Sequence, residues 1–208
     1  MLGNPGRRAL AAILDDAEAG RLRPVYHCGV EIDYPWDYSV LDGKRIDYLP
    51  VVTGVGCPNR CTFCCIAAAY GGRYHPRAVE CVMSDVRAVA GRSRFASFVD
   101  SNLYGNRDHL LAVCAAMRAA GVRLAWGAQA TVAVGDDPEA LRALHAAGCR
   151  ILFVGLETLD QANLRGVGKP YVVGRYRELV ARMQGAGLAV AGYFLVGLDG
   201  DDESTFER

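Results

Sequence analysis

The sequence has no long apolar stretch and no excess of charge of either sign. Its apolar runs fall well short of the roughly 20 residues that span a bilayer, and residues 1–8 lack the apolar core of a signal peptide. Lysine plus arginine and aspartate plus glutamate each number 23, which gives no electrostatic reason to bind nucleic acid or an anionic membrane. The composition therefore predicts a cytoplasmic protein without a transmembrane segment or a nucleic-acid partner.

Residues 1–47 also lack the pattern of a complete domain. A helix is expected over residues 8–19, where Gly20 would end it, and the prolines and aromatics that follow are typical of a packed connector. The 208 residues are 51% hydrophobic, which is enough for one sizeable core rather than two. We therefore expect an irregular linker over residues 1–47 and one folded unit over residues 48–208.

Cysteine, by contrast, is concentrated at one place. Cys57, Cys61 and Cys64 lie within a single run of eight residues, directly after an apolar segment. Thiols gathered this closely in a cytosolic chain more often hold a metal than form disulfides. A structural zinc site would need a fourth ligand, for which Cys65 is too close to Cys64 and His75 is the other candidate. Three thiolates would leave one coordination position for a different ligand.

From residue 49 onward, strand-like runs alternate with segments of helical period. Strands are expected at about 49–53, 95–99, 123–128, 150–156 and 188–196. Asp137 is the expected N-cap of the third helix between them, and Gly121, Gly148 and Gly187 stand just past three helix ends. Such alternation predicts parallel strands joined by crossovers. A complete eight-unit barrel needs roughly 250 residues, so the fold class is α/β, a partial (β/α) barrel truncated after about five strands.

Polar residues follow the predicted strands. They are Asp100 and Asn102 after the second strand, Gln129 after the third, Glu157 after the fourth, and Asp199 and Asp201 after the fifth. A helix cap or solvated turn is the ordinary role for most of them. Glu157 differs because it directly follows an apolar strand, and a buried carboxylate needs a partner. The carboxyl ends of parallel strands share one rim, so these groups are expected near the three thiols.

The string CPNRCTFC, residues 57–64, resembles the signature C-x3-C-x-aromatic-C of the radical S-adenosylmethionine (SAM) superfamily. The resemblance continues through FVDSNLYGN, ILFVGLETLDQANLRGVGK and AGYFLVGLDGDDESTFE. It is closest to the subgroup with a cobalamin-binding domain, which includes hopanoid C-methylases. Residues 1–47 resemble only the exit linker of that domain, so the domain itself is expected to be absent. Ser101 departs from the second aspartate of the Asp-Asp-Asn found in many relatives.

The resemblance implies a role for each matching residue. Cys57, Cys61 and Cys64 would each bind one iron of a 4Fe-4S cluster, whose fourth iron is chelated by the amino and carboxylate groups of SAM. Phe63 would lie beside the adenine, and Gly192 and Gly197 would let the last strand approach it. Asp100 and Asn102 would contact the methionine amino group, and Lys169 would pair with the methionine carboxylate. Glu157 would bind the ribose or the methionyl moiety. The ordinary alternative for Lys169 is a surface loop lysine.

The implied reaction is reductive cleavage of SAM to a 5′-deoxyadenosyl radical, which removes hydrogen from a small-molecule, lipid-like substrate. Methylation of an unactivated carbon is one candidate outcome, cobalamin is a candidate further cofactor, and a reduced flavodoxin or ferredoxin would donate the electron. Three alternatives stay open at this point: a structural zinc protein, a ferredoxin-like electron carrier that lacks its fourth cysteine, and a fragment that binds a cluster without turnover.

Overall fold

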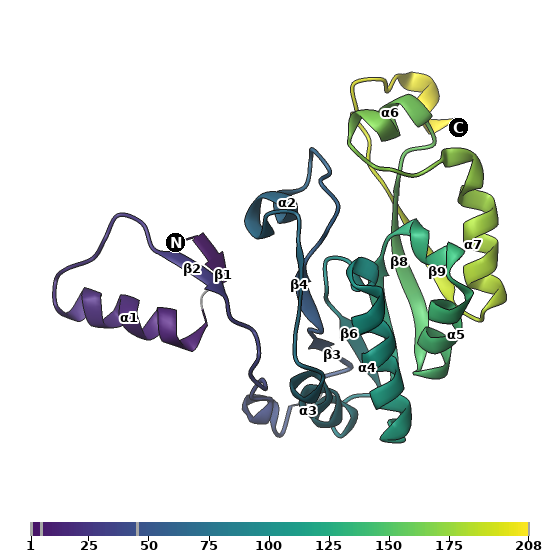
Figure 1. Cartoon of the computed structure of the whole chain (residues 1–208). Helices are drawn as coiled ribbons and strands as arrows, with labels where there is room; N and C mark the ends of the chain where they lie inside the picture. Colours follow the sequence, from purple (N-terminus) through teal and green to yellow (C-terminus); the bar gives the residue numbers. More distant parts are fainter. Residues whose placement is uncertain (1, 5, 45, 208) are drawn as a thin grey trace.

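The central sheet of the protein has five parallel strands. The computed structural model describes residues 2–4, 6–44 and 46–207. In spatial order the strands are β3 (Tyr48–Val51), β6 (Phe95–Phe98), β7 (Ala125–Ala130), β8 (Cys149–Glu157) and β9 (Ala189–Phe194). Spatial order follows chain order, so the sheet is wound in one direction as in a barrel (Figure 1). The α/β fold and the five-stranded partial barrel are confirmed.

Helices that join the strands cover one face of this sheet (Figure 1). They are α3 (Val79–Ala90), α4 (Arg107–Ala119), α5 (Pro138–Ala146) and α7 (Tyr176–Gly185). Asp137 caps α5 as expected, since its side chain accepts a hydrogen bond from the Ala140 amide. Between sheet and helices, the Phe98 and Trp126 rings stack with centroids 4.2 Å apart. None of the described helices is long and apolar enough to cross a membrane.

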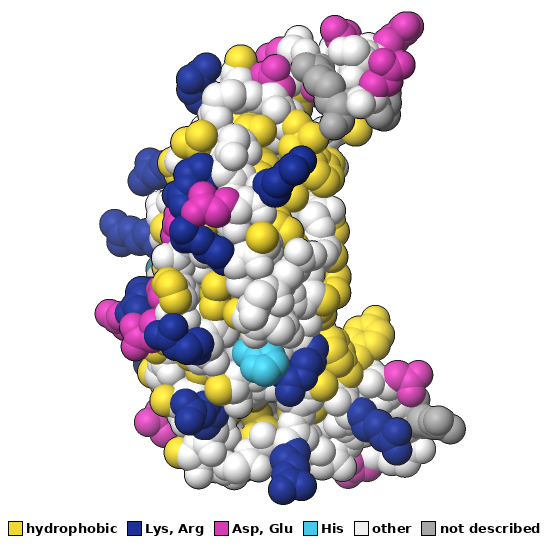
Figure 2. All heavy atoms as spheres, turned by 90° about the vertical axis from the view of Figure 1, so that its right-hand side faces the viewer, with side chains coloured by type: hydrophobic (Ala, Val, Ile, Leu, Met, Phe, Trp, Pro, Cys, Tyr) yellow, Lys and Arg dark blue, Asp and Glu magenta, His cyan; other side chains and the backbone are white. Residues whose placement is uncertain are grey.

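The outer surface of this helical layer carries mixed charge. Figure 2 shows arginine and lysine side chains interspersed with acidic ones over this side of the molecule. Arg175 and Arg182 both pair with Asp136, which precedes α5, and Arg182 also pairs with Glu178. These pairs are solvent-exposed and each contributes little to stability. They link the segment before α5 to Arg175 and to α7.

A small hairpin stands at the start of the folded unit and was absent from the sequence prediction. Strands β4 (Gly54–Gly56) and β5 (Tyr74–Pro76) pair antiparallel, and the short helix α2 (Cys65–Tyr70) lies between them. Residues 57–64, hereafter the cysteine loop, connect β4 to α2. Strands of three residues are too short to show a recognisable period. The hairpin places the cysteine loop above the carboxyl ends of the parallel strands (Figure 1).

The N-terminal segment is more regular than expected. Strands β1 (Leu2–Asn4) and β2 (His27–Val30) form a parallel pair, joined by helix α1 (Arg7–Glu18). The expected helix is therefore present, and the description of residues 1–47 as irregular is wrong for this part because both strands are too short to register as a pattern. Among the described residues of 31–44 and 46–47, the only regular element is the 3-10 turn η1 (Ser39–Leu41). The division of the chain at residue 47 stays a prediction.

Candidate functional site

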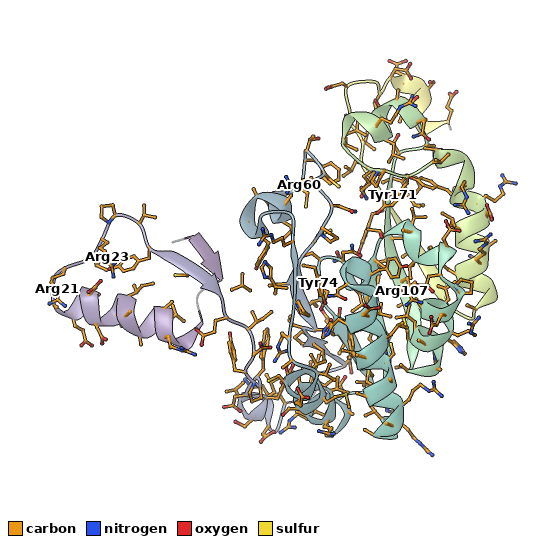
Figure 3. The ribbon with its side chains drawn as sticks, viewed as in Figure 1. Arg21, Arg23, Arg60, Tyr74, Arg107 and Tyr171 are labelled. Carbon is orange, nitrogen blue, oxygen red and sulfur yellow. The ribbon has the colours of Figure 1, made fainter. Side chains whose placement is uncertain are left out.

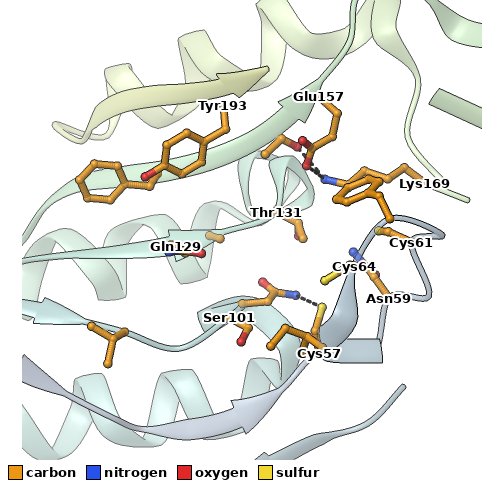
Figure 4. Close-up of a pocket in the computed structure, with 17 residues that line it drawn as sticks. Cys57, Asn59, Cys61, Cys64, Ser101, Gln129, Thr131, Glu157, Lys169 and Tyr193 are labelled. Atoms are coloured by element: carbon orange, nitrogen blue, oxygen red, sulfur yellow. Dashed lines mark hydrogen bonds and ion pairs between the residues drawn. The ribbon is translucent and has the colours of Figure 1, made fainter. Parts of the chain in front are cut away.

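A cavity of about 380 Å³ lies between the cysteine loop and the carboxyl ends of β6 to β9 (Figure 4). Its lining includes the three thiols Cys57, Cys61 and Cys64 together with Phe63, Asn102, Gln129, Glu157 and Lys169. Sequence reasoning had singled out all of these residues. Asp100, Gly192 and Gly197 lie outside this lining. The strand ends and the cysteine loop thus meet at one rim, as the parallel topology requires.

The three thiols occupy a tight turn of the cysteine loop. The Cys64 amide donates to the Cys61 carbonyl at 3.1 Å, and Cys61 is buried while Cys57 and Cys64 are half-buried. Burial raises the pKa of the Cys61 thiol, an effect that the nearby Lys169 cation opposes. Metal binding requires the thiolate, so loading a metal here would release the Cys61 proton. Cys65 is exposed at the start of α2 and does not line the cavity.

Asn102 supplies an unpaired acceptor beside the thiols. Its amide nitrogen Nδ2 donates to Cys57 Sγ at 3.6 Å. Its Oδ1 is buried and, among the described residues, has no hydrogen-bond partner. A buried acceptor left unsatisfied costs about 1–3 kcal/mol, so a donor from a bound molecule is the expected partner. An ammonium group placed next to the thiols would meet this requirement.

Glu157 and Lys169 form a buried ion pair across the cavity from Cys57 (Figure 4). Each residue is only 7% exposed, so the alternative of a surface lysine is wrong. Lys169 Nζ also donates to the Gly155 carbonyl at 3.0 Å. Glu157 is the one described non-glycine residue with a positive φ, at 65°, a conformation that persists only when its surroundings impose it. The pair offers one cationic and one anionic group to a ligand in the cavity.

Gly155 is a site residue that sequence reasoning missed. It lines the cavity two residues before Glu157 in β8. A Cβ atom there would stand 2.9 Å from Lys169 Nζ and collide with the Glu157 carboxylate. Only glycine leaves room for the ion pair at this position. A glycine inside an otherwise apolar strand was the available signal.

Asp100 points away from the cavity and has a different role from the one expected. Its carboxylate accepts hydrogen bonds from the Thr53 amide at 2.8 Å, the Thr53 hydroxyl at 2.6 Å and the Tyr74 hydroxyl at 2.6 Å. Successive residues of an extended strand face opposite sides, and it is Val99 and Ser101 that line the cavity. Asp100 therefore ties the end of β6 to the hairpin, with Tyr74 lying between β4 and α4 (Figure 3).

Burial dominates the electrostatics of this carboxylate. It raises the pKa of Asp100, while the hydrogen bonds from Thr53 and Tyr74 act in the opposite direction. Burial and the Asp100 charge together raise the pKa of Tyr74, which stays a hydrogen-bond donor. His109 of α4 completes the group, with its Nε2 2.9 Å from the Thr53 carbonyl. Sequence reasoning had not linked Thr53, Tyr74 or His109 to the site.

The two glycines of the last strand lie elsewhere. A Cβ on Gly192 would come within 3.0 Å of the Leu156 side chain, so its closest neighbour is the adjacent strand. Gly197 borders a separate depression on the far side of Phe63. Asp201 was expected to be a solvated turn residue, but it accepts bonds of 2.9 Å from the Gly197 and Leu198 amides and from Asn163. It thereby fixes the turn after β9 against α6 (Gln161–Gly166).

The donor groups bear on the kind of metal that could bind. Within the described ranges, no three His, Cys, Asp or Glu side chains gather so as to hold a single metal ion. In a 4Fe-4S cluster each thiolate ligates a different iron, so its ligands are spread over the cluster rather than gathered on one ion. The zinc alternative has no ligand set among these residues.

Comparison with known proteins gives the family context. A sequence model of the Radical SAM superfamily matches residues 51–208. The bacteriochlorophyllide d C-12(1)-methyltransferase of Chlorobaculum tepidum is 28% identical over 170 residues, which cover 79% of this chain and 37% of that protein. The hopanoid C-2 methylase of Rhodopseudomonas palustris is 29% identical over 159 residues, covering 73% of this chain and 30% of the methylase. The chain thus spans about a third of these relatives' length.

Solved structures agree on the fold. The radical SAM methyltransferase TsrM from Kitasatospora setae, with cobalamin and a [4Fe-4S] cluster bound, superposes with a TM-score of 0.76 at 19% identity, covering 98% of this chain and 48% of TsrM. The cobalamin-dependent SAM radical enzyme OxsB with aqua-cobalamin bound gives 0.74 at 16% identity, covering 92% of this chain and 32% of OxsB. Likeness at such identities concerns the fold, and function has to be argued from the site.

Proposed function

Because the chain belongs to the radical SAM superfamily, we propose that Cys57, Cys61 and Cys64 bind the 4Fe-4S cluster and that SAM binds in the adjoining cavity. The observation that carries this proposal is the convergence of three thiols, an unpaired buried acceptor and a buried ion pair on one cavity. When bound, the cluster and SAM together supply reductive cleavage to methionine and a 5′-deoxyadenosyl radical.

The residues of the chain would bind and orient SAM from two sides. Asn102 Oδ1 would accept a hydrogen bond from the methionine ammonium, which satisfies the only buried side-chain polar atom left unpaired among the described residues. Lys169 would offer its cation to the methionine carboxylate, and Glu157 would accept bonds from the ribose hydroxyls or the ammonium. Phe63, which is 47% exposed, would cover one side of the adenine and shield the cavity from water.

The cavity wall also favours an apolar substrate. Its lining also includes Val99, which follows β6, and Phe153 and Tyr193 on β8 and β9. The rings of Phe153 and Tyr193 lie nearly parallel, with centroids 6.1 Å apart. Glu157 is the only acidic and Lys169 the only basic residue among the described residues that line the cavity. Since relatives are named as methyltransferases of bacteriochlorophyllide d and of hopanoids, and a related solved structure has cobalamin bound, we propose methylation of an unactivated carbon of an apolar small molecule, with methylcobalamin as the methyl donor. A flavodoxin- or ferredoxin-type donor would supply the electron.

Anaerobic reconstitution with iron and sulfide tests the proposal. The wild type should bind about four irons per chain and convert SAM to 5′-deoxyadenosine in the presence of a strong reductant. Cys61→Ala should lose most of the iron and all of the product, while Cys65→Ala, which changes the exposed neighbouring thiol, should retain both. A wild type that binds zinc alone would contradict the proposal, and a protein with iron but no product would support a cluster-binding fragment instead.

A further inference from the structure

One segment contacts both the cysteine loop and the ion pair. Residues 167–171, which we call the clasp, follow α6 and run alongside the cysteine loop. The Thr62 amide donates to the Val167 carbonyl at 3.1 Å, and Asn59 Nδ2 donates to the Tyr171 hydroxyl at 3.0 Å. Figure 3 labels Tyr171 and Arg60, which come from these two facing segments.

The two segments approach closely between these hydrogen bonds. Gly168 has a φ of 75°, and a Cβ there would stand 3.2 Å from the Arg60 carbonyl. Glycine is therefore required both by the backbone conformation and by the space available. The clasp therefore contacts residues 59–62 of the cysteine loop, through a hydrogen bond at each end of the clasp and a close backbone approach between them.

The middle of the clasp also reaches into the cavity. Lys169 pairs with Glu157 and donates to the Gly155 carbonyl at 3.0 Å. Val167 and Tyr171 bind the cysteine loop on either side of Lys169 in the chain. The position of the ammonium group of Lys169 relative to the three thiols is therefore set by the clasp.

Hydrogen bonds to residues of α6 fix the clasp on its other side. Gln161 Nε2 donates to the Tyr171 carbonyl at 3.1 Å, and the Val173 amide donates to Gln161 Oε1 at 2.9 Å. The Lys169 amide donates to the Leu164 carbonyl at 3.1 Å. Tyr171 is thus fixed by its backbone to a helix, and its hydroxyl is the group that reaches the cysteine loop.

We propose that Tyr171 is a positioning residue that holds the cysteine loop, through Asn59, at a fixed distance from the Glu157–Lys169 pair. The functional consequence rests on the proposed function, in which one SAM molecule contacts both sets of residues. Removing the hydroxyl would let the loop open, so that the thiols become more accessible and the two halves of the SAM site no longer match. Since one net hydrogen bond contributes modestly, the expected effects are roughly two- to twelvefold.

Alkylation of cysteines in the cluster-free, reduced protein tests the structural part. N-ethylmaleimide labelling, followed residue by residue by mass spectrometry at fixed pH, should show Cys61 reacting roughly two- to twelvefold faster in Tyr171→Phe and in Asn59→Ala. The double variant should show no further increase, because both changes break one bond. Tyr26→Phe is the matched control, since it removes a hydroxyl that bonds to Asp16 at 2.9 Å in the N-terminal segment.

Cys114 and Cys149, which are buried, serve as internal reporters of global unfolding and should react at wild-type rates. If Tyr171→Phe also raises the alkylation rates of these two thiols, the Cys61 rate in Asn59→Ala alone tests the proposal. That change truncates a half-buried loop side chain and leaves the core intact. An unchanged Cys61 rate in Asn59→Ala would overturn the proposal. An equal increase in Tyr26→Phe would overturn it as well.

The reconstituted protein gives a readout that a general loss of stability would not produce. Tyr171→Phe should keep the wild-type iron content while its dissociation constant for SAM rises roughly two- to twelvefold. Parallel losses of iron and of SAM binding, or unchanged SAM binding, would contradict a positioning role. A wild type that binds no SAM would refute the proposed function, while the alkylation result would still decide whether the clasp holds the loop.

Discussion

At the scale of single residues, the Glu157–Lys169 pair organises the cavity wall. Two buried opposite charges are stable only with good geometry and further hydrogen bonds, and here the Gly155 carbonyl provides one of these bonds. The positive φ of Glu157 and the missing side chain at Gly155 both serve the placement of this pair. A ligand with its own carboxylate and ammonium groups would form ion pairs with Lys169 and Glu157, respectively.

Replacing the Glu157 carboxylate tests its part in binding. Glu157→Gln keeps the size of the side chain and removes the charge, so the dissociation constant for SAM should rise about tenfold, in line with the loss of a charge-assisted hydrogen bond. Iron content should stay at the wild-type level. Equilibrium dialysis with labelled SAM measures both proteins, with Glu203→Gln, an exposed change, as the control. Unchanged binding would remove Glu157 from the site.

Gly155→Ala tests whether the ion pair needs the free space beside it. The new Cβ would stand 2.9 Å from Lys169 Nζ, so we expect a loss of about 1–3 kcal/mol in unfolding free energy. For a chain of this length, each 1 kcal/mol lowers the thermal midpoint by about 2–4 °C. Gly174→Ala is the control because nothing lies within 4 Å of its added Cβ. Equal midpoints for the two variants would contradict the assigned packing.

At the scale of elements, the hairpin and its buried carboxylate position the cysteine loop. Asp100 joins β6 to Thr53 and to Tyr74 of β5. The sequence identified Asp100 as a polar residue at a strand end. Whether its side chain faces the cavity or the hairpin depends on where the strand ends, and the sequence does not define that residue. The hairpin and α2 were missed for a related reason, since elements of three to six residues carry too little periodicity.

The raised pKa of Asp100 predicts a specific pH dependence. Because burial raises this pKa above its ordinary value of 3.8, the folded protein binds the proton more tightly than the unfolded chain does. Its contribution to unfolding free energy therefore falls as pH rises from the ordinary value through the raised one. We expect the unfolding free energy of the wild type minus that of Asp100→Asn to decline with rising pH, then level off.

Urea unfolding of the cluster-free protein at stepped pH values measures this difference. Asp136→Asn provides a control of opposite sign, because the hydrogen bond from Arg175 lowers the pKa of Asp136. Its contribution should be present above pH 4 and lost as pH falls through the lowered pKa. A difference for Asp100 that is flat, or that follows the direction of the Asp136 control, would contradict a raised pKa.

At the scale of the whole molecule, a buried arginine fixes the N-terminal segment to the barrel. Arg77 pairs with Asp85 at 2.8 Å, and both side chains are fully buried. The guanidinium also donates to the carbonyls of Ile32, Tyr34 and Val52. One side chain therefore joins residues before the sheet to Val52, which directly follows β3, and to α3. The sequence showed no sign of this contact, which links residues more than forty positions apart.

Arg77→Ala should therefore destabilise the whole chain. It leaves the Asp85 charge uncompensated in the interior, which costs about 3–5 kcal/mol. Limited proteolysis should then cut faster within residues 31–47, and the urea midpoint should fall. Arg87→Ala removes an exposed arginine of the same helix neighbourhood and should change neither. If the Arg77 variant matched that control, the segment would have to be held in another way.

The sequence predicted the elements that are long enough to show a hydrophobic period. Long alternating segments placed all five parallel strands and the four main helices correctly, because burial imposes a regular period on them. The cavity-lining thiols and Glu157 were found from their types and order, whereas Lys169 was found only through the family resemblance. The missed groups, such as Gly155, Tyr74 and Tyr171, act through contacts between distant segments, which leave no local pattern.

The central claim is that three thiols hold a cluster whose remaining iron is open to SAM. Electron paramagnetic resonance of the reconstituted, reduced protein tests it most directly. We predict a signal of a reduced 4Fe-4S cluster whose line shape changes when SAM is added, and which is absent in Cys61→Ala and retained in Cys65→Ala. A cluster signal that SAM leaves unchanged, or one that survives in Cys61→Ala, would contradict the account.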